Sequence, residues 1–231
     1  MRMISNICRN NPCYKANSTI EPKGIMIHSV GCNQPSAAVF IRQWNKEQPA
    51  TTVCPHAVID ANCGDIYQTL PWEHRGWHGG GAVNDTHIGI EMCEPACIRY
   101  VSGAVFTCSD VPAARRAARK TYDAAVELCA YLCKKYGLDP MERNVIISHT
   151  EGGKLGIASS HADPEHLWNQ LGLDNTMQGF REDVQRAIGG KKTLYRVQIG
   201  AFESRENAEN YAAKARDDGY SAFIVEHSSA E

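Results

Sequence analysis

The chain has 231 residues, 43% of them hydrophobic and 22% charged, and its 24 basic and 26 acidic side chains leave a formal net charge of −2. At about 150 residues per domain, this length predicts one full domain and a smaller second unit. The near-neutral charge excludes a strongly basic, nucleic-acid-binding surface as the main activity, and no apolar run approaches the roughly 20 residues of a membrane span. Residues 1–23 are polar and lack an apolar stretch of signal-peptide length, so we expect synthesis in the cytoplasm.

The N-terminal part predicts strands separated by one helix. After an irregular arm over residues 1–23, the apolar run Gly24–Val30 is too short for a typical helix and predicts a strand buried on both faces. Residues Pro35–Glu47 have helical spacing, with Ser36 as the N-cap. The run His56–Asp60 predicts a second strand.

A Gly-rich loop lies between the next two predicted strands. Residues Gly64–Leu70 are typical of a hairpin partner for His56–Asp60. The loop Trp72–Asn84 carries two Trp and two His. Loops of this length inside a compact domain are usually functional or disordered, and the Trp residues disfavour disorder. A third short strand is predicted at His87–Met92.

The longest predicted helix runs from Ala113 to Tyr136, where apolar residues form one stripe at helical period. Gly137 follows as a C-terminal cap, and Pro140 blocks continuation. A fourth buried strand is predicted at Asn144–His149. Strand, helix and strand in this order predict an α/β domain.

The C-terminal part predicts a small β-α-β unit after a linker at residues 188–193. Apolar side chains alternate with polar ones over Tyr195–Ile199, which indicates a half-buried strand. Ser204 caps a helix that Gly219 ends, and Ser221–Val225 predicts another strand. So few residues do not support a core by themselves.

Titratable side chains stand at the ends of the predicted strands. His28, Glu91 and His149 each close one strand, and His56 opens another, which would bring it to the same rim if that strand runs antiparallel. A single His at a strand end is more often solvated or bound to a backbone carbonyl, but ligands in α/β sheets sit beyond the carboxyl ends of strands. The loop after His149 adds Asp163. Two imidazoles and a carboxylate with an open fourth position suit a catalytic zinc site.

The chain has ten cysteines and no Cys-x-x-Cys pair, which disfavours a zinc ribbon or a thioredoxin-like motif. We expect most of them to be buried or half-buried free thiols. A second metal site built from Cys93, Cys97 and Cys108 is the weaker alternative.

Several motifs in order carry a resemblance to a known family: IMIHSV, HAVIDANCGDIYQ, WHGG, NDTHIGIE, then a strand-ending His and a later Asp-Pro. Together they resemble the type 2 N-acetylmuramoyl-L-alanine amidases, a family that includes phage lysozyme-like amidases and peptidoglycan recognition proteins. The resemblance spans about 24–175. It implies a central mixed β-sheet flanked by helices, with a zinc cleft at one sheet edge.

By this resemblance, one Zn²⁺ per chain is held by His28, His149 and Asp163. Glu91 matches the catalytic glutamate, which would take a proton from the attacking water and return it to the leaving amine. His161 stands where the family often carries Lys or Thr and would donate an N–H to the oxyanion. Some relatives have a Tyr where this chain has Pro55, so Glu91 is expected to be the base.

The implied substrate is bacterial peptidoglycan, cut at the amide bond between N-acetylmuramic acid and L-alanine. The residues expected to contact it are His56, Trp77, His78 and Asn84. The competing interpretation of Trp77 is core packing. For the remaining histidines the packing or surface interpretation is preferred: His74, His87 and His166.

The C-terminal segment resembles the first half of a SPOR domain, a type that binds glycan strands stripped of peptides. We therefore expect an amidase domain over 1–187, a linker over 188–193 and a partial SPOR-like unit over 194–231. That unit would dock on the amidase or mediate self-association.

Three functional classes follow from these patterns. The first is a zinc amidase acting on the cell wall as a phage or prophage endolysin, released by lysis or a holin-type route, or as an autolysin. The second is a non-catalytic peptidoglycan-binding module. The third is a thiol hydrolase that uses Cys54 or Cys32 near His56 or His28. Chelation of metal separates the three classes.

Overall fold

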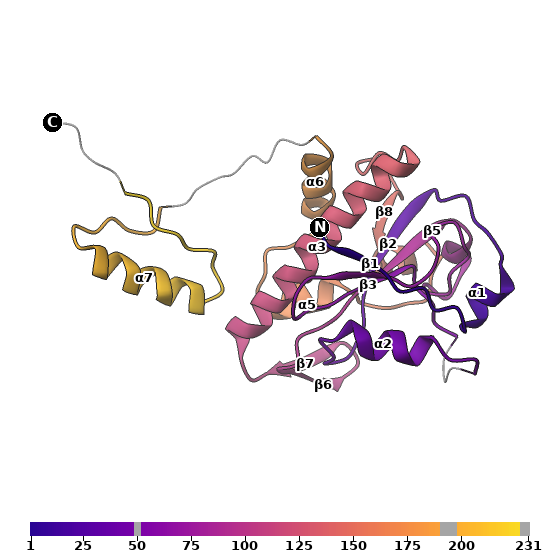
Figure 1. The fold of residues 1–231 in the computed structure, drawn as a ribbon, viewed down its shortest axis with the longest axis horizontal. Coiled ribbons are helices and arrows are strands. Elements are labelled where there is room, and N and C mark those ends of the chain that lie inside the picture. The colour runs from indigo at the N-terminus through magenta and orange to yellow at the C-terminus, as the bar shows by residue number, and fades with distance from the viewer. Residues whose placement is uncertain (49–51, 190–197, 227–231) are drawn as a thin grey trace. The chain divides into compact units, whose positions relative to one another are not determined.

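The structure is a computed structural model that describes residues 1–48, 52–189 and 198–226. The chain divides into two compact units, Met1–Lys192 and Thr193–Glu231. The first unit is a mixed α/β fold with a central sheet flanked by helices, which confirms the predicted fold class (Figure 1). None of the helices in the described residues is both long and apolar enough to cross a membrane.

Six strands form the central sheet. In spatial order they are β1 (Met3–Ser5), β4 (Ile66–Gln68), β3 (Ala57–Ile59), β5 (His87–Met92), β2 (Gly24–Ser29) and β8 (Ile146–Ser148). Only the β3–β4 pair is antiparallel, and all other neighbours run parallel. The predicted hairpin is therefore present, and the strands around it make the sheet mixed.

The two faces of the sheet have different partners, because successive side chains of a strand point to opposite faces. The face of β2 that carries Ile25 and Ile27 belongs to the main hydrophobic core, together with Ile88 and Ile90 of β5. The opposite face of β2 carries His28 at its carboxyl end. Strands buried on both faces explain the continuous apolar runs in the sequence.

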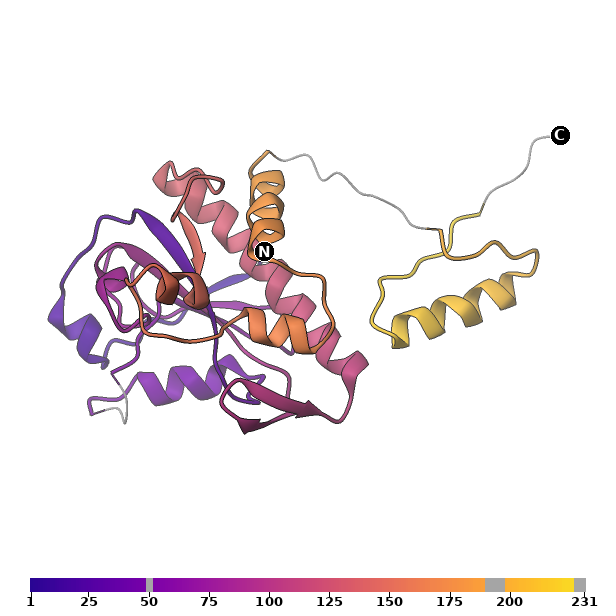
Figure 2. The ribbon, with the colours of Figure 1, turned by 180° about the vertical axis from the view of Figure 1, so that it is seen from behind.

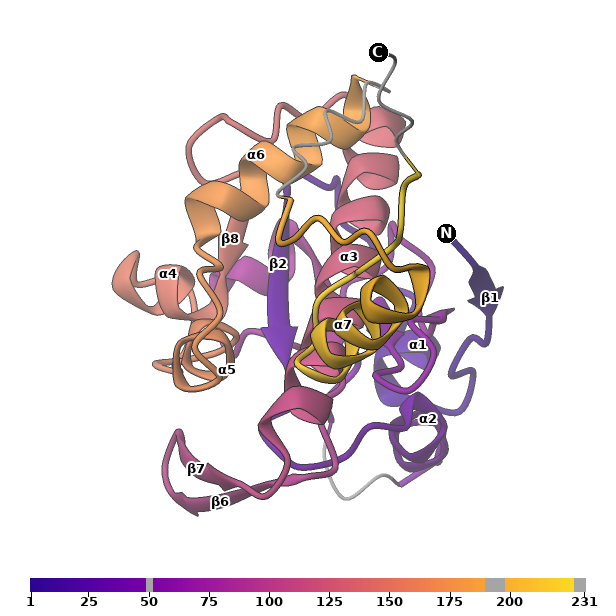
Figure 3. The same ribbon diagram turned by 90° about the vertical axis from the view of Figure 1, so that its left-hand side faces the viewer.

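Helix α3 (Val111–Tyr136) covers the core face and ends where the sequence predicts. Its N-cap Asp110 accepts a hydrogen bond from the Ala113 N–H, and Gly137 adopts a left-handed conformation with φ 67°. Burial of its apolar stripe against the sheet stabilises the fold by roughly 1.5–3 kcal/mol for each large side chain. Helix α6 (Met177–Ile188) lies along α3, where the rings of Tyr122 and Phe180 are 5.2 Å apart between centroids (Figures 1 and 3).

Shorter elements complete the first unit: α2 (Ala37–Trp44), η1 (Ala82–Asp85), the hairpin β6 (Ile98–Ser102) and β7 (Val105–Cys108), α4 (His149–Lys154) and α5 (Glu165–Gln170). Helix α2 packs on the other side of β3 from α3, through Phe40 and Val58. Helices α4 and α5 come to the front when the fold is seen from behind (Figure 2).

Two predictions about the ends of the chain were wrong. The arm over residues 1–23 is not wholly irregular, because β1 pairs with β4 and a short helix α1 (Pro12–Ala16) follows. In the second unit, α7 (Arg205–Asp217) forms with Ser204 as its N-cap. The strand predicted at Ser221–Val225 does not form, and the carbonyl oxygen of Ala222 in this segment accepts a hydrogen bond from the Arg216 side chain at 2.8 Å. Of Tyr195–Ile199, only the last two residues are described, and they form no strand.

Candidate metal centre

The parallel strands β2, β5 and β8 bring their carboxyl ends to one edge of the sheet. His28 and Glu91 are direct neighbours in the β2–β5 register, so their side chains share a face. His149 is the first residue after β8, at the start of α4. The carboxyl ends of these three strands, which are far apart in the sequence, therefore meet at one site, and this is the edge at which α/β sheets bind ligands.

The start of α4 is fixed by a capping box, which sets the position of His149. The Ser148 Oγ accepts a hydrogen bond from the Glu151 N–H at 3.0 Å, and the Glu151 carboxylate accepts one from the Ser148 N–H at 3.2 Å. Arg181 of α6 binds the same carboxylate through two nitrogens, each at 2.9 Å. His149 is thus held by an element whose end is anchored to a second helix.

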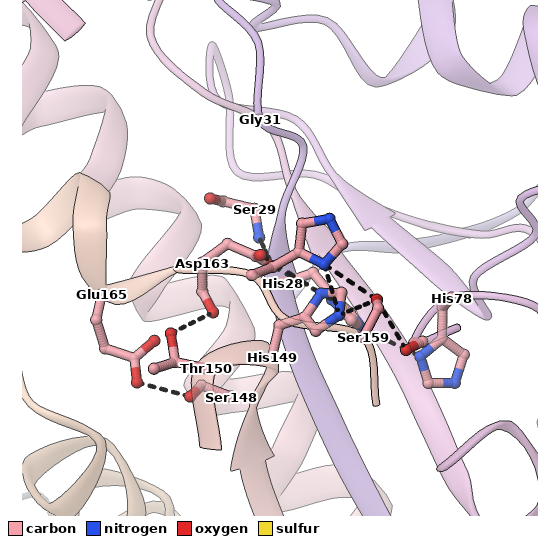
Figure 4. Close-up of polar contacts among 12 residues, drawn as sticks. His28, Ser29, Gly31, His78, Ser148, His149, Thr150, Ser159, Asp163 and Glu165 are labelled. Atoms are coloured by element: carbon pink, nitrogen blue, oxygen red, sulfur yellow. Dashed lines mark hydrogen bonds and ion pairs between the residues drawn. The ribbon is translucent and has the colours of Figure 1, made fainter. Parts of the chain in front are cut away.

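His28, His149 and Asp163 point toward one another (Figure 4). One donor atom of each lies within 4.8 Å of the others, and this is the single group of potential metal ligands among the described residues. The two Nδ1 atoms are 3.0 Å apart, and the Asp163 oxygens lie 3.3 Å from the Nδ1 of His28 and 3.4 Å from that of His149. The alternative cluster Cys93, Cys97 and Cys108 is not such a group.

These spacings fit a tetrahedral metal ion. With ligand bonds of about 2.0–2.1 Å, the donor atoms of tetrahedral zinc are about 3.3 Å apart. The two Nδ1 atoms are 3.0 Å apart, and each lies near a different oxygen of Asp163, His28 at 3.3 Å from Oδ2 and His149 at 3.4 Å from Oδ1; these separations are close to that edge length. Two imidazole nitrogens and one carboxylate also match the donor types of catalytic zinc sites, which leave a fourth position open.

The ionisation of these side chains favours metal binding. Burial alone raises the pKa of Asp163, but the adjacent imidazoles of His149 and His28 outweigh it and hold that pKa well below its usual range. Burial lowers the pKa of His28, so its imidazole is neutral at physiological pH. A carboxylate beside a neutral imidazole is the form in which these residues bind metal.

A hydrogen-bond chain sets the tautomer of His28. The His78 Nε2–H donates to the carbonyl oxygen of His87 at 3.1 Å, so the neutral ring of His78 has a bare Nδ1. That atom accepts the Nε2–H of His28 at 3.0 Å. The Nδ1 lone pair of His28 then faces His149 and Asp163. A backbone carbonyl of β5 therefore specifies which nitrogen is free to bind metal.

His149 has a comparable partner in Ser159 (Figure 4). The Ser159 hydroxyl donates to the carbonyl oxygen of Gly79 at 3.2 Å and accepts from the His149 Nε2 at 3.0 Å. This leaves the Nδ1 of His149 free on the side of Asp163. The exposed His161 places its Nδ1 3.1 Å from the same Nε2, on the ring edge away from the donor cluster.

Glu91 is buried beside the cluster and its Oε2 has no hydrogen-bond partner among the described residues. Burial, followed by the charges of Asp163 and Glu94, raises the pKa of Glu91 well above its ordinary value. A carboxyl group in this setting can hold a proton near neutral pH, as a general acid or base must.

Of the four residues expected to contact substrate, only Trp77 is exposed, at 39%. The prediction for His56 is corrected, because β3 runs parallel to β5 and His56 therefore lies at the amino end of β3, away from the carboxyl ends of the strands. Its two ring nitrogens are bound to backbone atoms of Gly89 and His74. Asn84 is fully buried and its Oδ1 accepts the N–H groups of His78 and Gly79, so it holds the loop. His78 is buried against His28 and supports that ring instead of facing solvent.

A close backbone approach makes room for His78. A Cβ atom at Gly89 of β5 would overlap the His78 ring, so any side chain there would force the ring or the strand to shift. The sequence did not single out Ser159 or this role of His78, because both contacts join segments far apart in the chain. For His74, His87 and His166 the structure shows packing or hydrogen-bonding contacts within the fold.

Comparison with known proteins identifies the family. The chain matches the model described as N-acetylmuramoyl-L-alanine amidase over residues 18–166, and the SPOR domain model over residues 156–229. It is 33% identical to the N-acetylmuramoyl-L-alanine amidase XlyA of Bacillus subtilis (strain 168) over 90 residues, which are 38% of this chain and 28% of XlyA. Its identity with CwlH of the same organism is 32% over 91 residues, 38% of this chain and 34% of CwlH. The chain thus spans about a third or less of these relatives.

Solved structures show the same fold. The Staphylococcus aureus hydrolase AmiA, in complex with its ligand, superposes with a TM-score of 0.62 at 16% identity, over 81% of this chain and 83% of AmiA. The catalytic domain of XlyA superposes with a TM-score of 0.53 at 22% identity, over 80% of this chain and 99% of that domain. The likeness to each concerns the fold.

Proposed function

Because this chain belongs to the N-acetylmuramoyl-L-alanine amidase family, we propose that it is a zinc-dependent hydrolase of the amide bond between N-acetylmuramic acid and L-alanine in bacterial peptidoglycan. The observation that carries the proposal is the group His28, His149 and Asp163, in which the two Nδ1 atoms are 3.0 Å apart and each lies 3.3–3.4 Å from an oxygen of Asp163. Such spacing fits the tetrahedral coordination of zinc.

In this proposal each residue has a separate task. His28, His149 and Asp163 would hold one Zn²⁺, which when bound supplies a Lewis acid and lowers the pKa of a coordinated water to about 7. Glu91 takes the proton of the attacking water on its unpartnered Oε2 and returns it to the leaving L-alanine amine. Burial of Glu91 keeps the proton on the carboxyl group between the two transfers.

The exposed residues around the cluster would contact the substrate. His161 is exposed next to His149 and would donate an N–H to the oxygen of the scissile carbonyl. Trp77 offers an aromatic face for a sugar, and the guanidinium of Arg75 lies 5.6 Å above its ring. We place the bound glycan along this side of the site.

For the biological role, we propose that the protein acts on the cell wall as an endolysin or autolysin. Residues 1–187 would form the catalytic domain, 188–193 the linker and 194–231 a SPOR-like unit. The SPOR match begins earlier, at residue 156. Glycan binding, docking on the amidase or self-association would be the task of the C-terminal unit.

One experiment tests the proposal against its alternatives. Purified protein is incubated with peptidoglycan, and new L-alanine amino groups are counted before chelation, after chelation and after zinc is restored. We expect release that chelation abolishes and zinc restores. Unchanged release after chelation would support a thiol hydrolase, although Cys54 is fully buried and burial raises the pKa of Cys32. Binding to peptidoglycan without release would identify a binding module.

A further inference from the structure

The ten cysteines are free thiols in the structure, and only Cys63 is exposed. The Cys13 thiol lies against the segment that contains Cys54, because its Sγ is 3.8 Å from the carbonyl oxygen of Thr52, and it interacts with the Cys54 thiol. The thiols of Cys97 and Cys108 also interact with each other. We propose that Cys13 and Cys54 are a disulfide-forming pair, which a low-molecular-weight disulfide oxidises outside a reducing compartment. The bond would tie the N-terminal segment to the edge of the metal site.

Backbone interactions hold Cys13 against the segment that contains Cys54. Asn11 caps helix α1, because its Oδ1 accepts the Cys13 N–H at 2.8 Å. The Nδ2 of the same side chain donates to the carbonyl oxygens of Trp44, at 3.0 Å, and Val53, at 3.2 Å. Asn11 is fully buried, so these bonds fix the first turn of α1 beside the residue that precedes Cys54.

Cys54 in turn is paired with the loop that carries Trp77. The Cys54 N–H donates to the Trp77 carbonyl at 2.9 Å, and the Trp77 N–H donates to the Cys54 carbonyl at 3.1 Å. Cys54 is fully buried, whereas Trp77 is 39% exposed. A disulfide between Cys13 and Cys54 would therefore also anchor the backbone of Trp77, the exposed residue that precedes His78.

The two thiols differ in accessibility and in pKa, as an attacking cysteine and a resolving cysteine do. Cys13 is half-buried, and its hydrogen bond with Cys54 and the charge of Arg75 lower its pKa. The same hydrogen bond and burial raise the pKa of Cys54. Cys13 is thus the thiol that a soluble disulfide reaches and that ionises first. A metal does not explain the pair, because no third ligand completes a group with it among the described residues.

The chemistry is thiol–disulfide exchange, for example with oxidised glutathione. The Cys13 thiolate attacks one sulfur of that disulfide, which breaks the S–S bond and releases one glutathione thiolate. Cys54 then loses its proton to solvent and attacks the Cys13 sulfur, releasing the second glutathione. Two protein thiols are oxidised to one disulfide, and one glutathione disulfide is reduced to two thiols.

The other cysteines provide internal comparisons. Cys97 and Cys108 also interact, but burial and the neighbouring thiol raise the pKa of Cys97, whereas the pKa of Cys13 is lowered. Cys129 and Cys133 are buried on α3, and burial raises the pKa of both thiols. We expect Cys13 and Cys54 to oxidise at least about threefold faster than the Cys97 pair, because thiolate fraction outweighs the loss of nucleophilicity.

The test uses the full chain in mixtures of reduced and oxidised glutathione. Samples are quenched with iodoacetamide over time, digested without reduction and mapped by mass spectrometry, and thermal unfolding is recorded for the reduced and oxidised protein. The variant Cys13→Ser removes the attacking thiol, and Cys108→Ser is the matched control. Closing a loop of about 40 residues is expected to raise the Tm by about 5–10 °C.

The proposal is supported by a Cys13–Cys54 cross-linked peptide and a raised Tm, both lost in Cys13→Ser and kept in Cys108→Ser. It is overturned if both cysteines remain alkylated in excess oxidised glutathione. It is equally overturned if Cys54 links to Cys8, or if the Cys97 pair oxidises first. Cross-linking is read from the peptide map, so these outcomes do not depend on amidase activity.

Discussion

His78 is expected to control zinc affinity through the tautomer of His28, without contacting the metal. Replacing it by Ala removes the acceptor 3.0 Å from the His28 Nε2 and leaves that buried N–H unpaired. An unpaired buried donor costs about 1–3 kcal/mol. Loss of an outer hydrogen bond to a metal-binding His typically weakens metal affinity about 10–100-fold, which corresponds to about 1.4–2.7 kcal/mol.

The assay is competition for zinc with a chromophoric chelator, together with thermal unfolding of the metal-free protein. In His78→Asn the Oδ1 can replace the lost Nδ1 acceptor, so we expect this variant to recover most of the affinity. The matched control is His74→Ala in the same loop, because the His74 ring stacks on Tyr14 and does not belong to the group of potential metal ligands. The reasoning is refuted if His78→Ala folds and binds zinc normally, or if Asn is no better than Ala.

Three further changes test other parts of the site. Glu91→Gln should bind zinc normally but lose about 10²–10⁴-fold in turnover, since Gln cannot carry the proton; amine release and zinc content are measured on one sample. Gly89→Ala should displace the His78 ring and destabilise the protein by about 1–3 kcal/mol, as measured by urea unfolding. Burial raises the pKa of Glu94 to about 7, although hydrogen bonds from the Tyr100 hydroxyl and the Gly31 N–H oppose this shift. A carboxyl group whose pKa is raised by folding stabilises the native state below its unfolded pKa, and this contribution is lost as the pH rises through 7. Relative to the wild type, Glu94→Gln should therefore gain about 1–3 kcal/mol of stability between pH 5 and pH 8.

Each of these changes has a control or a contradicting outcome. Zinc loss in Glu91→Gln would mean that the carboxylate supports the metal site. Normal stability and zinc affinity in Gly89→Ala would show that the His78 ring can move. For Glu94→Gln, the matched control is the exposed Glu142→Gln, and a flat difference across the pH range would contradict the buried setting of Glu94.

The sequence by itself determined the elements that deliver the cluster. Short apolar runs that end in His28, Glu91 or His149 predict buried strands, because a strand covered on both faces needs apolar side chains throughout. The helical stripe ending at Gly137 predicts α3, because capping and periodicity are local properties. Motif order then indicated the family.

Only the tertiary structure decided which residues face the cluster and which support it. The direction of β3 depends on pairing with β5, and that pairing buries His56 below the rim. The contacts of His78 with His28 and of Ser159 with His149 join distant segments. Local propensity carries no information on such contacts, since they arise when the sheet packs and the Gly-rich loop closes over Gly89. The position of each strand end follows from the local sequence, whereas the hydrogen-bond partners that orient the side chains at those ends depend on the complete fold.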